Sequence, residues 1–215
     1  MRFDRSMLRL YAVTDRAWTG KMTLYEQIEA ALSGGVTMVQ LREKSMGTAE
    51  RIQEARRVGE LCHRYSVPLI VNDDVDAALA AGADGVHVGI EDATVSSIRK
   101  RVGKDFIVGA TAKTVEQAQR AQDEGASYLG VGAVFPSPTK KNALRITLAQ
   151  LREICASVNI PACAIGGITA ENMTQLRGGG MAGFAVVSAI FAADDIVAAT
   201  KELKNRAIDL IGGKA

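Results

Sequence analysis

Side chains suited to binding a phosphate group alternate along the segment Val36–Lys44, which is Val-Thr-Met-Val-Gln-Leu-Arg-Glu-Lys. If this segment begins as an extended strand, Gln40, Arg42 and Lys44 share one of its two faces. Arginine offers a planar fork of donors and lysine a compact charge, so the pair suits a phosphate or a diphosphate. A solvated strand end with two surface charges is the alternative interpretation. The other polar residues of the chain therefore determine which of these two interpretations is favoured.

Two carboxylates follow two successive apolar segments further along the chain. Asp73 comes after the segment 67–71, and Asp92 comes after the segment 84–88. Two carboxylates in oxygen-rich surroundings suit a hard cation, and they predict Mg²⁺ held together with substrate phosphates. Each aspartate could instead cap the helix that follows it, and the two roles can coexist. Asn72 is suited to orienting a heteroatom ring or a metal-bound water, although it is also a common turn residue.

A second group of donors occupies the loop Gly132–Lys141. Its two prolines stiffen it, and Ser137, Thr139 and the paired lysines supply hydroxyl and ammonium donors that suit a phosphate. The glycine pair 166–167 and the dipeptide 188–189 follow the last two predicted strands, where barrel proteins bind phosphate through backbone N–H groups at helix N-termini. A glycine pair by itself most often makes a turn. Its position in the chain carries this prediction.

The histidines and cysteines argue against zinc and nucleophile chemistry. His87 lies between two valines and is interpreted as a packed core residue, because no second histidine lies nearby in the sequence to complete a zinc site. Cys163 is interpreted as a small core residue, since no general base is indicated beside it. Cys62, Cys155 and Cys163 are odd in number and lack C-x-x-C spacing, which argues against a disulfide framework and favours a reducing cytoplasm.

Short apolar segments alternate with amphipathic ones along the whole chain. Strands are predicted at 8–13, 36–41, 67–71, 84–88, 105–110, 127–132, 160–165 and 183–187. Helices are predicted at 23–33, 48–65, 74–81, 94–102, 114–124, 148–157, 170–177 and 195–211, with Thr23 as an N-cap. Helical connections force parallel pairing. No G-x-G-x-x-G follows the first strand, which favours a closed α/β (β/α)₈ TIM barrel over an open doubly wound sheet.

Length and composition set the remaining bounds. A chain of 215 residues that is 47% hydrophobic suits a single TIM-barrel domain over residues 1–215, with its active site at the C-terminal ends of the strands. The net charge of +2 arises from basic and acidic residues spread along the chain, which predicts no nucleic-acid partner. The first residues contain no apolar targeting segment and no window is apolar enough for a membrane span, so a cytoplasmic protein is expected.

With these features in place, the chain resembles the thiamine-phosphate synthases over nearly its whole length. The resemblance rests on specific motifs, which are Leu10–Asp15, Gln40–Lys44, Val71–Asp73, Gly82–His87, Glu91–Asp92, Gly130–Gly132, Phe135–Lys141, Ala164–Ile168 and Val186–Ile190. It implies a transferase that joins 4-amino-2-methyl-5-(diphosphooxymethyl)pyrimidine to 4-methyl-5-(2-phosphoethyl)thiazole, in its carboxylated form. Thiamine phosphate and diphosphate would be the products, and the family's accepted mechanism is a dissociative one that needs no protein nucleophile.

The resemblance also implies a role for each motif residue. Arg42, Lys44 and Lys140 would be catalytic, because they could neutralise the charge that develops on the leaving diphosphate. Asp73 and Asp92 would hold the Mg²⁺ cofactor. The substrates would be bound by Gln40, Leu41, Arg42, Glu43, Lys44, Asn72, Thr111, Ser137, Pro138, Thr139, Lys140, Gly166, Gly167, Val187 and Ser188.

Three departures from the family pattern leave alternatives open. Ile90 stands where the family usually has glutamine, which we expect to weaken the support of the Mg²⁺ site. Thr111 and Lys113 stand where a serine and a histidine are usual, and Ala133 replaces a common proline. The related thiazole tautomerases use a histidine near the position of Lys113. A tautomerase-like isomerase or a non-catalytic barrel that binds thiazole phosphate is thus the alternative function, and a homodimer is compatible with the sequence.

Overall fold

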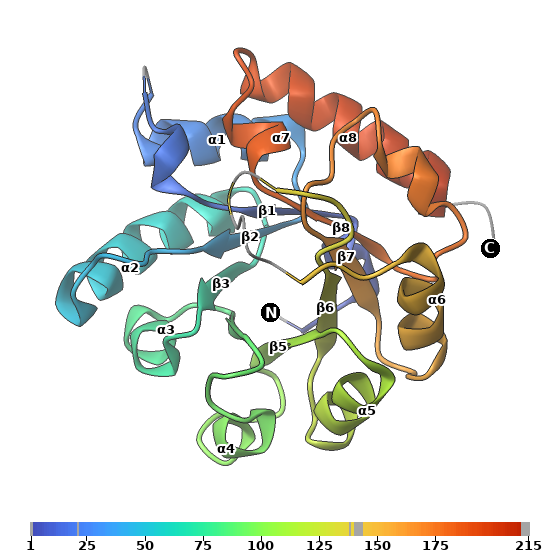
Figure 1. Ribbon diagram of the computed structural model, residues 1–215. Coiled ribbons are helices and arrows are strands. Elements are labelled where there is room, and N and C mark those ends of the chain that lie inside the picture. Colours follow the sequence, from blue (N-terminus) through green and yellow to red (C-terminus); the bar gives the residue numbers. More distant parts are fainter. Residues whose placement is uncertain (1, 21, 138, 140–143, 212–215) are drawn as a thin grey trace.

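Eight short buried strands pair in parallel and close into a barrel, as the sequence predicts (Figure 1). The computed structural model describes residues 2–20, 22–137, 139 and 144–211. Each strand pairs with the next along the chain, and β8 pairs with β1, for example Phe184 with Leu10. The strands are β1 (Leu10–Val13), β2 (Met38–Leu41), β3 (Leu69–Asn72), β4 (Gly85–Val88), β5 (Ile107–Ala112), β6 (Tyr128–Gly132), β7 (Ala162–Ile165) and β8 (Gly183–Val186).

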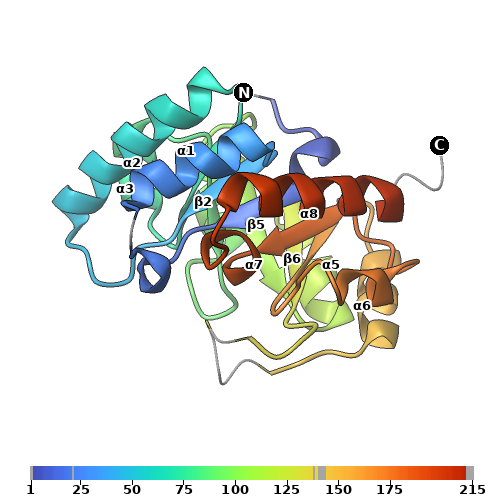
Figure 2. The same ribbon diagram turned by 90° about the horizontal axis from the view of Figure 1, so that it is seen from above.

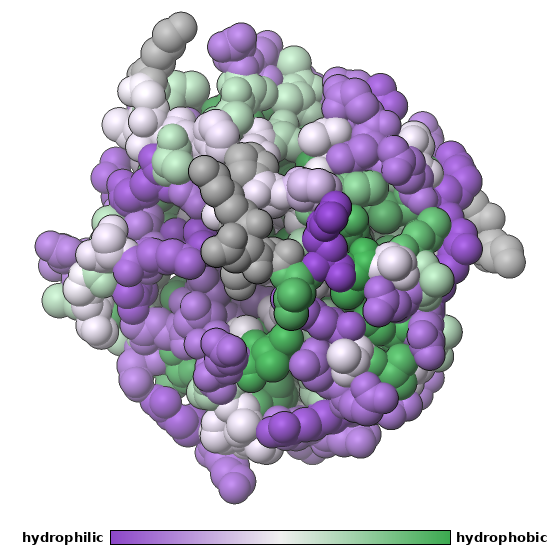
Figure 3. Space-filling model, viewed as in Figure 1, coloured by the Kyte–Doolittle hydropathy of each residue, from purple (hydrophilic) through white to green (hydrophobic). Residues whose placement is uncertain are grey.

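Helices surround the barrel and connect its strands except β7 and β8 (Figure 2). They are α1 (Leu24–Gly34), α2 (Thr48–Arg64), α3 (Val75–Ala81), α4 (Val95–Arg99), α5 (Val115–Asp123), α6 (Leu148–Ala156), α7 (Ser188–Phe191) and α8 (Ile196–Ile211), and both α7 and α8 follow the last strand. Helix α1 packs beside α8, so the first and last long helices of the described chain lie side by side. The face viewed in Figure 3 is mostly hydrophilic, with smaller apolar areas between the polar ones.

Two groups of buried side chains form the core, one on each side of the barrel wall. Along β2, Val39 and Leu41 join the outer group, which packs against the helices, and Met38 belongs to the inner group. Burying an outer side chain such as Ile28 of α1, which is 0% exposed, contributes about 1.5–3 kcal/mol. Cys163 belongs to the inner group, as the sequence predicts. The alternation of faces therefore sends every second side chain of a strand into the barrel.

Several segments differ from the sequence prediction, which did not include α7 and made α4 longer than it is. The helix predicted at 170–177 is wrong, because only a 3₁₀ helix, η3 (Met173–Leu176), forms there. The Asn172 side chain turns the preceding loop by accepting a bond from the Thr169 N–H and donating one to the Gly167 carbonyl, and Gly178 then leaves the helix with a φ of +73°. The first strand begins at Leu10 because the segment before it, Arg5–Leu8, forms a 3₁₀ helix. In the described part of the chain, no helix is long and apolar enough to cross a membrane.

The N-terminal cap of α1 supplies a first test. The Thr23 hydroxyl accepts a hydrogen bond from the Glu26 N–H, and the Glu26 side chain bonds back to the Thr23 N–H. We expect Thr23→Ala to lower the free energy of unfolding by about 1 kcal/mol in urea denaturation. Thr48→Ala is the matched control, because Thr48 is exposed and α2 has no side-chain cap hydrogen bond. Equal losses in the two variants would contradict this account.

Candidate active site

A cavity of about 250 Å³ opens at the C-terminal ends of the strands, where the sequence places the site. Most of the predicted site residues that the structure describes line it, and they come from loops or strands far apart in the sequence. These are Gln40, Arg42, Lys44, Asn72, Asp73, Asp92, Thr111, Ser137, Thr139, Gly166, Gly167, Val187 and Ser188. Pro138 and Lys140, two further predicted residues, lie outside the described residues.

The end of β2 supplies the cationic side of the cavity. Gln40, Arg42 and Lys44 all line it, so the predicted common face is present. The Arg42 guanidinium is held by Asp15, whose Oδ2 lies 3.0 Å from Arg42 Nη1, and its side chain is only 16% exposed. The Thr14 hydroxyl also accepts a bond from the Arg42 N–H. This arginine is therefore fixed before any ligand binds, which lowers the entropy lost on binding an anion.

The side chains of Leu41 and Glu43 do not belong to the cavity lining, so their assignment to substrate binding stays a prediction that would have to rest on their backbone. Leu41 packs in the core between barrel and helices. The Glu43 Oε2 atom accepts a hydrogen bond from Arg16 Nε at 2.9 Å, and the Glu43 side chain is 2% exposed. The physical reason is the two-residue period of the strand, which turns these two side chains away from the face that carries Arg42.

Two carboxylates face one another at the ends of β3 and β4, next to the cationic side, because β2 pairs with β3. Neither serves as the N-cap that the alternative interpretation required, because Asp74 caps α3 and Thr94 caps α4. Burial, and then the charge and hydrogen bonding of Asp92, raise the pKa of Asp73 to about 6, and the cations Arg42 and Lys44 oppose this rise. The pair thus stores an electrostatic repulsion that a bound cation would relieve.

The local backbone of the acidic pair is specialised as well. Asp73 has a φ of +62°, a left-handed conformation that is unusual for a residue other than glycine. The Asn72 side chain donates a bond of 2.7 Å to Asp73 Oδ1, and the Gly89 N–H donates one of 2.7 Å to Asp92 Oδ2. A Cβ atom at Gly89 would come within 2.7 Å of that same Asp92 oxygen. Both carboxylates are therefore oriented by neighbouring residues.

The donor set fits a hard divalent cation with incomplete protein ligation. Asp73 and Asp92 are oxygen donors, and no group of three or more His, Cys, Asp or Glu metal ligands occurs among the described residues. Mg²⁺ is commonly held by one or two carboxylates together with substrate phosphates and water. The weakening of the Mg²⁺ site that Ile90 is expected to cause stays a prediction. Ile90 is 46% exposed and lies outside the lining of the main cavity.

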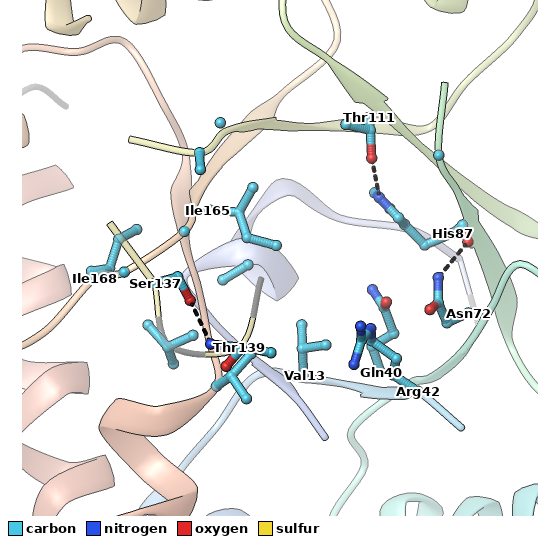
Figure 4. Close-up of a pocket in the computed structure, with 18 of the residues that line it drawn as sticks. Val13, Gln40, Arg42, Asn72, His87, Thr111, Ser137, Thr139, Ile165 and Ile168 are labelled. Carbon is cyan, nitrogen blue, oxygen red and sulfur yellow. Dashed lines mark hydrogen bonds between the residues drawn. The ribbon is translucent and has the colours of Figure 1, made fainter. Parts of the chain in front are cut away.

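Hydroxyl groups and tight glycines form the third side of the cavity. The Thr139 N–H donates to the Ser137 hydroxyl at 3.2 Å, as Figure 4 shows, and the Thr139 hydroxyl is buried without a hydrogen-bond partner among the described residues. Gly167 has a φ of +62°, and a Cβ atom there would lie 2.0 Å from the Pro136 carbonyl oxygen. Only glycine lets the two loops approach so closely. An unpaired buried hydroxyl is costly, so this corner is suited to a ligand that accepts hydrogen bonds.

The floor of the cavity contains His87, whose ring contacts Thr111 (Figure 4). His87 is 7% exposed, which agrees with its interpretation as a packed histidine, yet it also lines the cavity. Burial lowers the pKa of His87 to about 4, although the charge of Asp92 opposes this shift. The ring is thus neutral at physiological pH and can both donate and accept a hydrogen bond.

Sequence reasoning gave no site role to several residues of the lining. Lys113 lies just before α5 and adds a cation, with its N–H donating to Gln117 Oε1 at 2.8 Å. Apolar walls come from the strand ends and loops, and are made by Val13, Ile165, Ile168 and Val186. The position of Lys113 two residues after Thr111 was the available signal, since both follow the same predicted strand. The apolar residues carried no such signal, because they resemble ordinary core residues.

A closed (β/α)₈ barrel with cations, paired carboxylates and glycine-rich corners at one rim defines the class of phosphate-binding barrel proteins. Residues 10–190 match the family described as thiamine monophosphate synthase. "Thiamine-phosphate synthase 2" of Streptococcus pneumoniae is 46% identical over 198 residues, which cover 92% of this chain and 94% of that protein. The chain belongs to the thiamine monophosphate synthase family, whose members are transferases of thiamine biosynthesis.

Further relatives agree with this assignment. The thiamine-phosphate synthase of Ruminiclostridium cellulolyticum is 46% identical over 194 residues, covering 90% of this chain and 92% of that one. A solved structure named thiamine phosphate pyrophosphorylase from Pyrococcus furiosus has a TM-score of 0.89 and 38% identity, covering 97% of this chain and 99% of its own. The structure of 3-hexulose-6-phosphate synthase, at a TM-score of 0.67 and 18% identity, shows a shared fold alone.

The acidic pair makes the stability of the metal-free protein depend on pH. The pKa of Asp73 is higher in the folded protein, about 6, than its ordinary value of 3.8, so folding is favoured at low pH and this benefit is lost as the pH rises through 6. We therefore expect Asp73→Asn to raise the unfolding temperature in EDTA above pH 6. The gain should shrink as the pH falls from 6 to 4.

The control for this measurement is Asp76→Asn, because Asp76 is a nearby exposed carboxylate that is ion-paired with Arg101. Thermal unfolding of both variants and the parent is followed from pH 4 to pH 8 in EDTA. A stability gain for Asp73→Asn that is the same at every pH would rule out relief of a like-charge pair. Addition of Mg²⁺ should stabilise the parent more than Asp73→Asn.

Proposed function

We propose that this protein condenses 4-amino-2-methyl-5-(diphosphooxymethyl)pyrimidine with 4-methyl-5-(2-phosphoethyl)thiazole, in its carboxylated form, to give thiamine phosphate. The C–O bond to the diphosphate breaks, its electron pair leaves with the diphosphate, and the thiazole nitrogen forms the new C–N bond. The carboxyl group of the thiazole leaves as carbon dioxide, and the electron pair that remains on the ring carbon takes up a proton from the solvent. The single observation that carries the proposal is the meeting of a cationic side, an acidic pair and a hydroxyl corner in one cavity.

The cationic side is suited to the leaving group. Arg42 is already oriented by Asp15, and it lines the cavity with Lys44. Two fixed positive charges stabilise a diphosphate whose negative charge grows as the C–O bond breaks, and their prior orientation means that little reorganisation is needed. Lys113 would add a third cation at the same cavity. The predicted contribution of Lys140 belongs to the same step.

Asp73 and Asp92 would hold Mg²⁺, which when bound supplies additional charge neutralisation for the diphosphate. The residues of the chain support this by orienting the carboxylates, as the bonds from Asn72 and Gly89 illustrate. The raised pKa of Asp73 indicates that the pair is poorly compensated by the protein alone. A cation and an anionic substrate are therefore expected to bind with mutual reinforcement.

The hydroxyl corner is suited to the second substrate. The thiazole phosphate would be received by the Ser137 hydroxyl, by the Thr139 hydroxyl, which has no partner in the part of the chain that the structure describes, and by the close-packed Gly166–Gly167 turn, together with the backbone at Val187 and Ser188. This corner faces the cavity from the loops after β6, β7 and β8, whereas Arg42 and Lys44 follow β2. Two anionic groups held apart in this way would bring their uncharged ends together, which supplies rate through positioning.

The relatives compared above are named synthases and a pyrophosphorylase, which gives no support to the isomerase or the non-catalytic alternative. Lys113 also occupies the place where the isomerase interpretation needs a histidine. Two further expectations stay proposals. We infer a cytoplasmic location, which agrees with three unpaired cysteines, and a homodimer stays a prediction.

The assay of the proposed reaction uses the purified full chain with both substrates and Mg²⁺, with and without EDTA. We expect thiamine phosphate and diphosphate to form in equal amounts and formation to stop in EDTA. Absence of product while thiazole phosphate is isomerised or merely bound would overturn the proposal.

Removal of one oriented cation gives a sharper test. We expect Arg42→Ala to lower kcat by roughly 100-fold or more, because it removes a preorganised charge at the leaving group. Arg64→Ala is the control, since this arginine is 61% exposed at the end of α2, pairs with Glu29 and donates to the Tyr25 hydroxyl, and does not line the cavity. Unchanged kcat in Arg42→Ala, or an equal loss in both variants, would contradict the assigned role.

A further inference from the structure

A continuous chain of hydrogen bonds crosses the barrel interior beneath the cavity. It links Gln40 of β2, Tyr11 of β1, Tyr128 of β6, His87 of β4 and Thr111 of β5. Gln40 Nε2 lies 2.6 Å from the Tyr11 oxygen, and the two tyrosine oxygens lie 2.8 Å apart. His87 Nδ1 lies 3.1 Å from the Tyr128 oxygen, and His87 Nε2 lies 3.1 Å from Thr111 Oγ1. The chain thus ends on a hydroxyl that lines the cavity.

The surrounding glycines show that this chain of hydrogen bonds has a fixed place in the barrel. A Cβ atom at Gly109 would lie 2.2 Å from Tyr128 Cζ, and one at Gly130 would lie 3.1 Å from His87 Cε1. The Tyr128 and His87 rings also lie against each other, with their centroids 5.5 Å apart and their planes tilted by 32°. Both tyrosines are at most 1% exposed, so water has little access to their hydroxyl groups. Each tyrosine hydroxyl therefore donates its proton to another member of this chain of hydrogen bonds.

The Gln40 amide at one end of the hydrogen-bond chain determines to which neighbour each hydroxyl group donates its proton. The amide nitrogen of Gln40 can only donate, so the Tyr11 oxygen accepts. The remaining contact available to the Tyr11 proton is Tyr128, whose own proton then goes to His87 Nδ1. The opposite direction would leave the Tyr11 proton buried without a partner, which is costly. His87 Nδ1 is therefore the acceptor nitrogen, and the ring proton sits on Nε2.

We propose that Tyr128 is a positioning residue, which fixes His87 in the Nε2–H form and thereby turns the Thr111 hydroxyl proton toward the cavity. His87 Nε2 donates to Thr111 Oγ1, so the threonine proton is free to donate to a ligand. In the other ring form, Thr111 would donate to His87 and present only lone pairs to the cavity. This inference rests on the proposed function in one respect, namely that the ligand at Thr111 is an anionic phosphate oxygen.

The orientation of the Thr111 hydroxyl determines whether it attracts or repels a negatively charged oxygen of the substrate. A hydroxyl that donates to a negatively charged oxygen forms a charge-assisted hydrogen bond. A hydroxyl whose proton is occupied elsewhere faces that oxygen with its own negative end. The same threonine thus favours or disfavours the diphosphate according to the ring form of a histidine behind it. Neither tyrosine belongs to the cavity lining, so their effect on the substrate is indirect.

The first test needs no substrate. The chain contains two histidines, so ¹⁵N-histidine labelling gives two sets of ring signals, and a His63→Gln variant identifies those of His87. At pH 7.5 the long-range ¹H–¹⁵N correlations of His87 are expected to show the proton on Nε2. Tyr128→Phe, which removes the donor to Nδ1, should give a mixture of the two ring forms. A proton on Nδ1 in the parent, or an unchanged pattern in Tyr128→Phe, would overturn the proposal.

Tyr11→Phe is the matched control for this measurement, because it removes a buried phenol oxygen from the same barrel interior without touching His87. The Tyr128 proton still has His87 as its partner in that variant, so the Nε2–H form should persist. A Tyr11→Phe variant with the same mixture as Tyr128→Phe would mean that general loosening of the interior is responsible. That result would also overturn the proposal.

The second test is kinetic and concerns the pyrimidine diphosphate. Tyr128→Phe should lower its kcat/KM by roughly 10-fold, and Thr111→Val by at least as much. In a Thr111→Val background, the further change Tyr128→Phe should have almost no additional effect, because both act through one hydroxyl. Additive losses would overturn the proposal. No turnover in any form, with the expected ring signals present, would instead count against the proposed function alone.

Discussion

Closure of the barrel between β1 and β8 is the constraint on which the site depends. It places the C-terminal ends of all eight parallel strands at one rim, so that residues far apart in the sequence line one cavity. Arg42 and Ser188 meet there although 146 positions (188 − 42) separate them. Because the strands are buried on both faces and only four to six residues long, the wall is rigid and the ligand-binding groups lie on its rim.

Several ordered groups of the site lower the stability of the unliganded protein. Asp73 adopts a left-handed backbone and faces a second carboxylate, and the Thr139 hydroxyl is buried without a partner among the described residues. Each feature costs free energy in the unliganded protein, and each would be relieved by a cation or an anion of the kind proposed. By contrast, Arg42 is already satisfied by Asp15. The site thus combines groups that are prepared in advance with groups that are completed by ligands.

The sequence predicted those features that follow from periodicity and chain order. Alternation along β2 correctly grouped Gln40 with Arg42, and the alternation of elements predicted the barrel. The same alternation turns the side chains of Leu41 and Glu43 away from the cavity, so their predicted part in substrate binding cannot come from their side chains. The helix at 170–177 was wrong because a side-chain turn and glycines override its pattern. The links from Tyr11 to His87 join different strands, so no local pattern could reveal them.

The central claim is that the cations and the acidic pair form one diphosphate site completed by a divalent metal. Its most direct measurement is the equilibrium binding of inorganic diphosphate to the full chain, by calorimetry at increasing Mg²⁺ concentrations. The account predicts weak binding in EDTA and an affinity that rises with Mg²⁺, because each ligand relieves a charge that the other leaves uncompensated. The comparison is made at Mg²⁺ concentrations too low to saturate the free diphosphate. Equal affinity for diphosphate with and without Mg²⁺ would contradict the account.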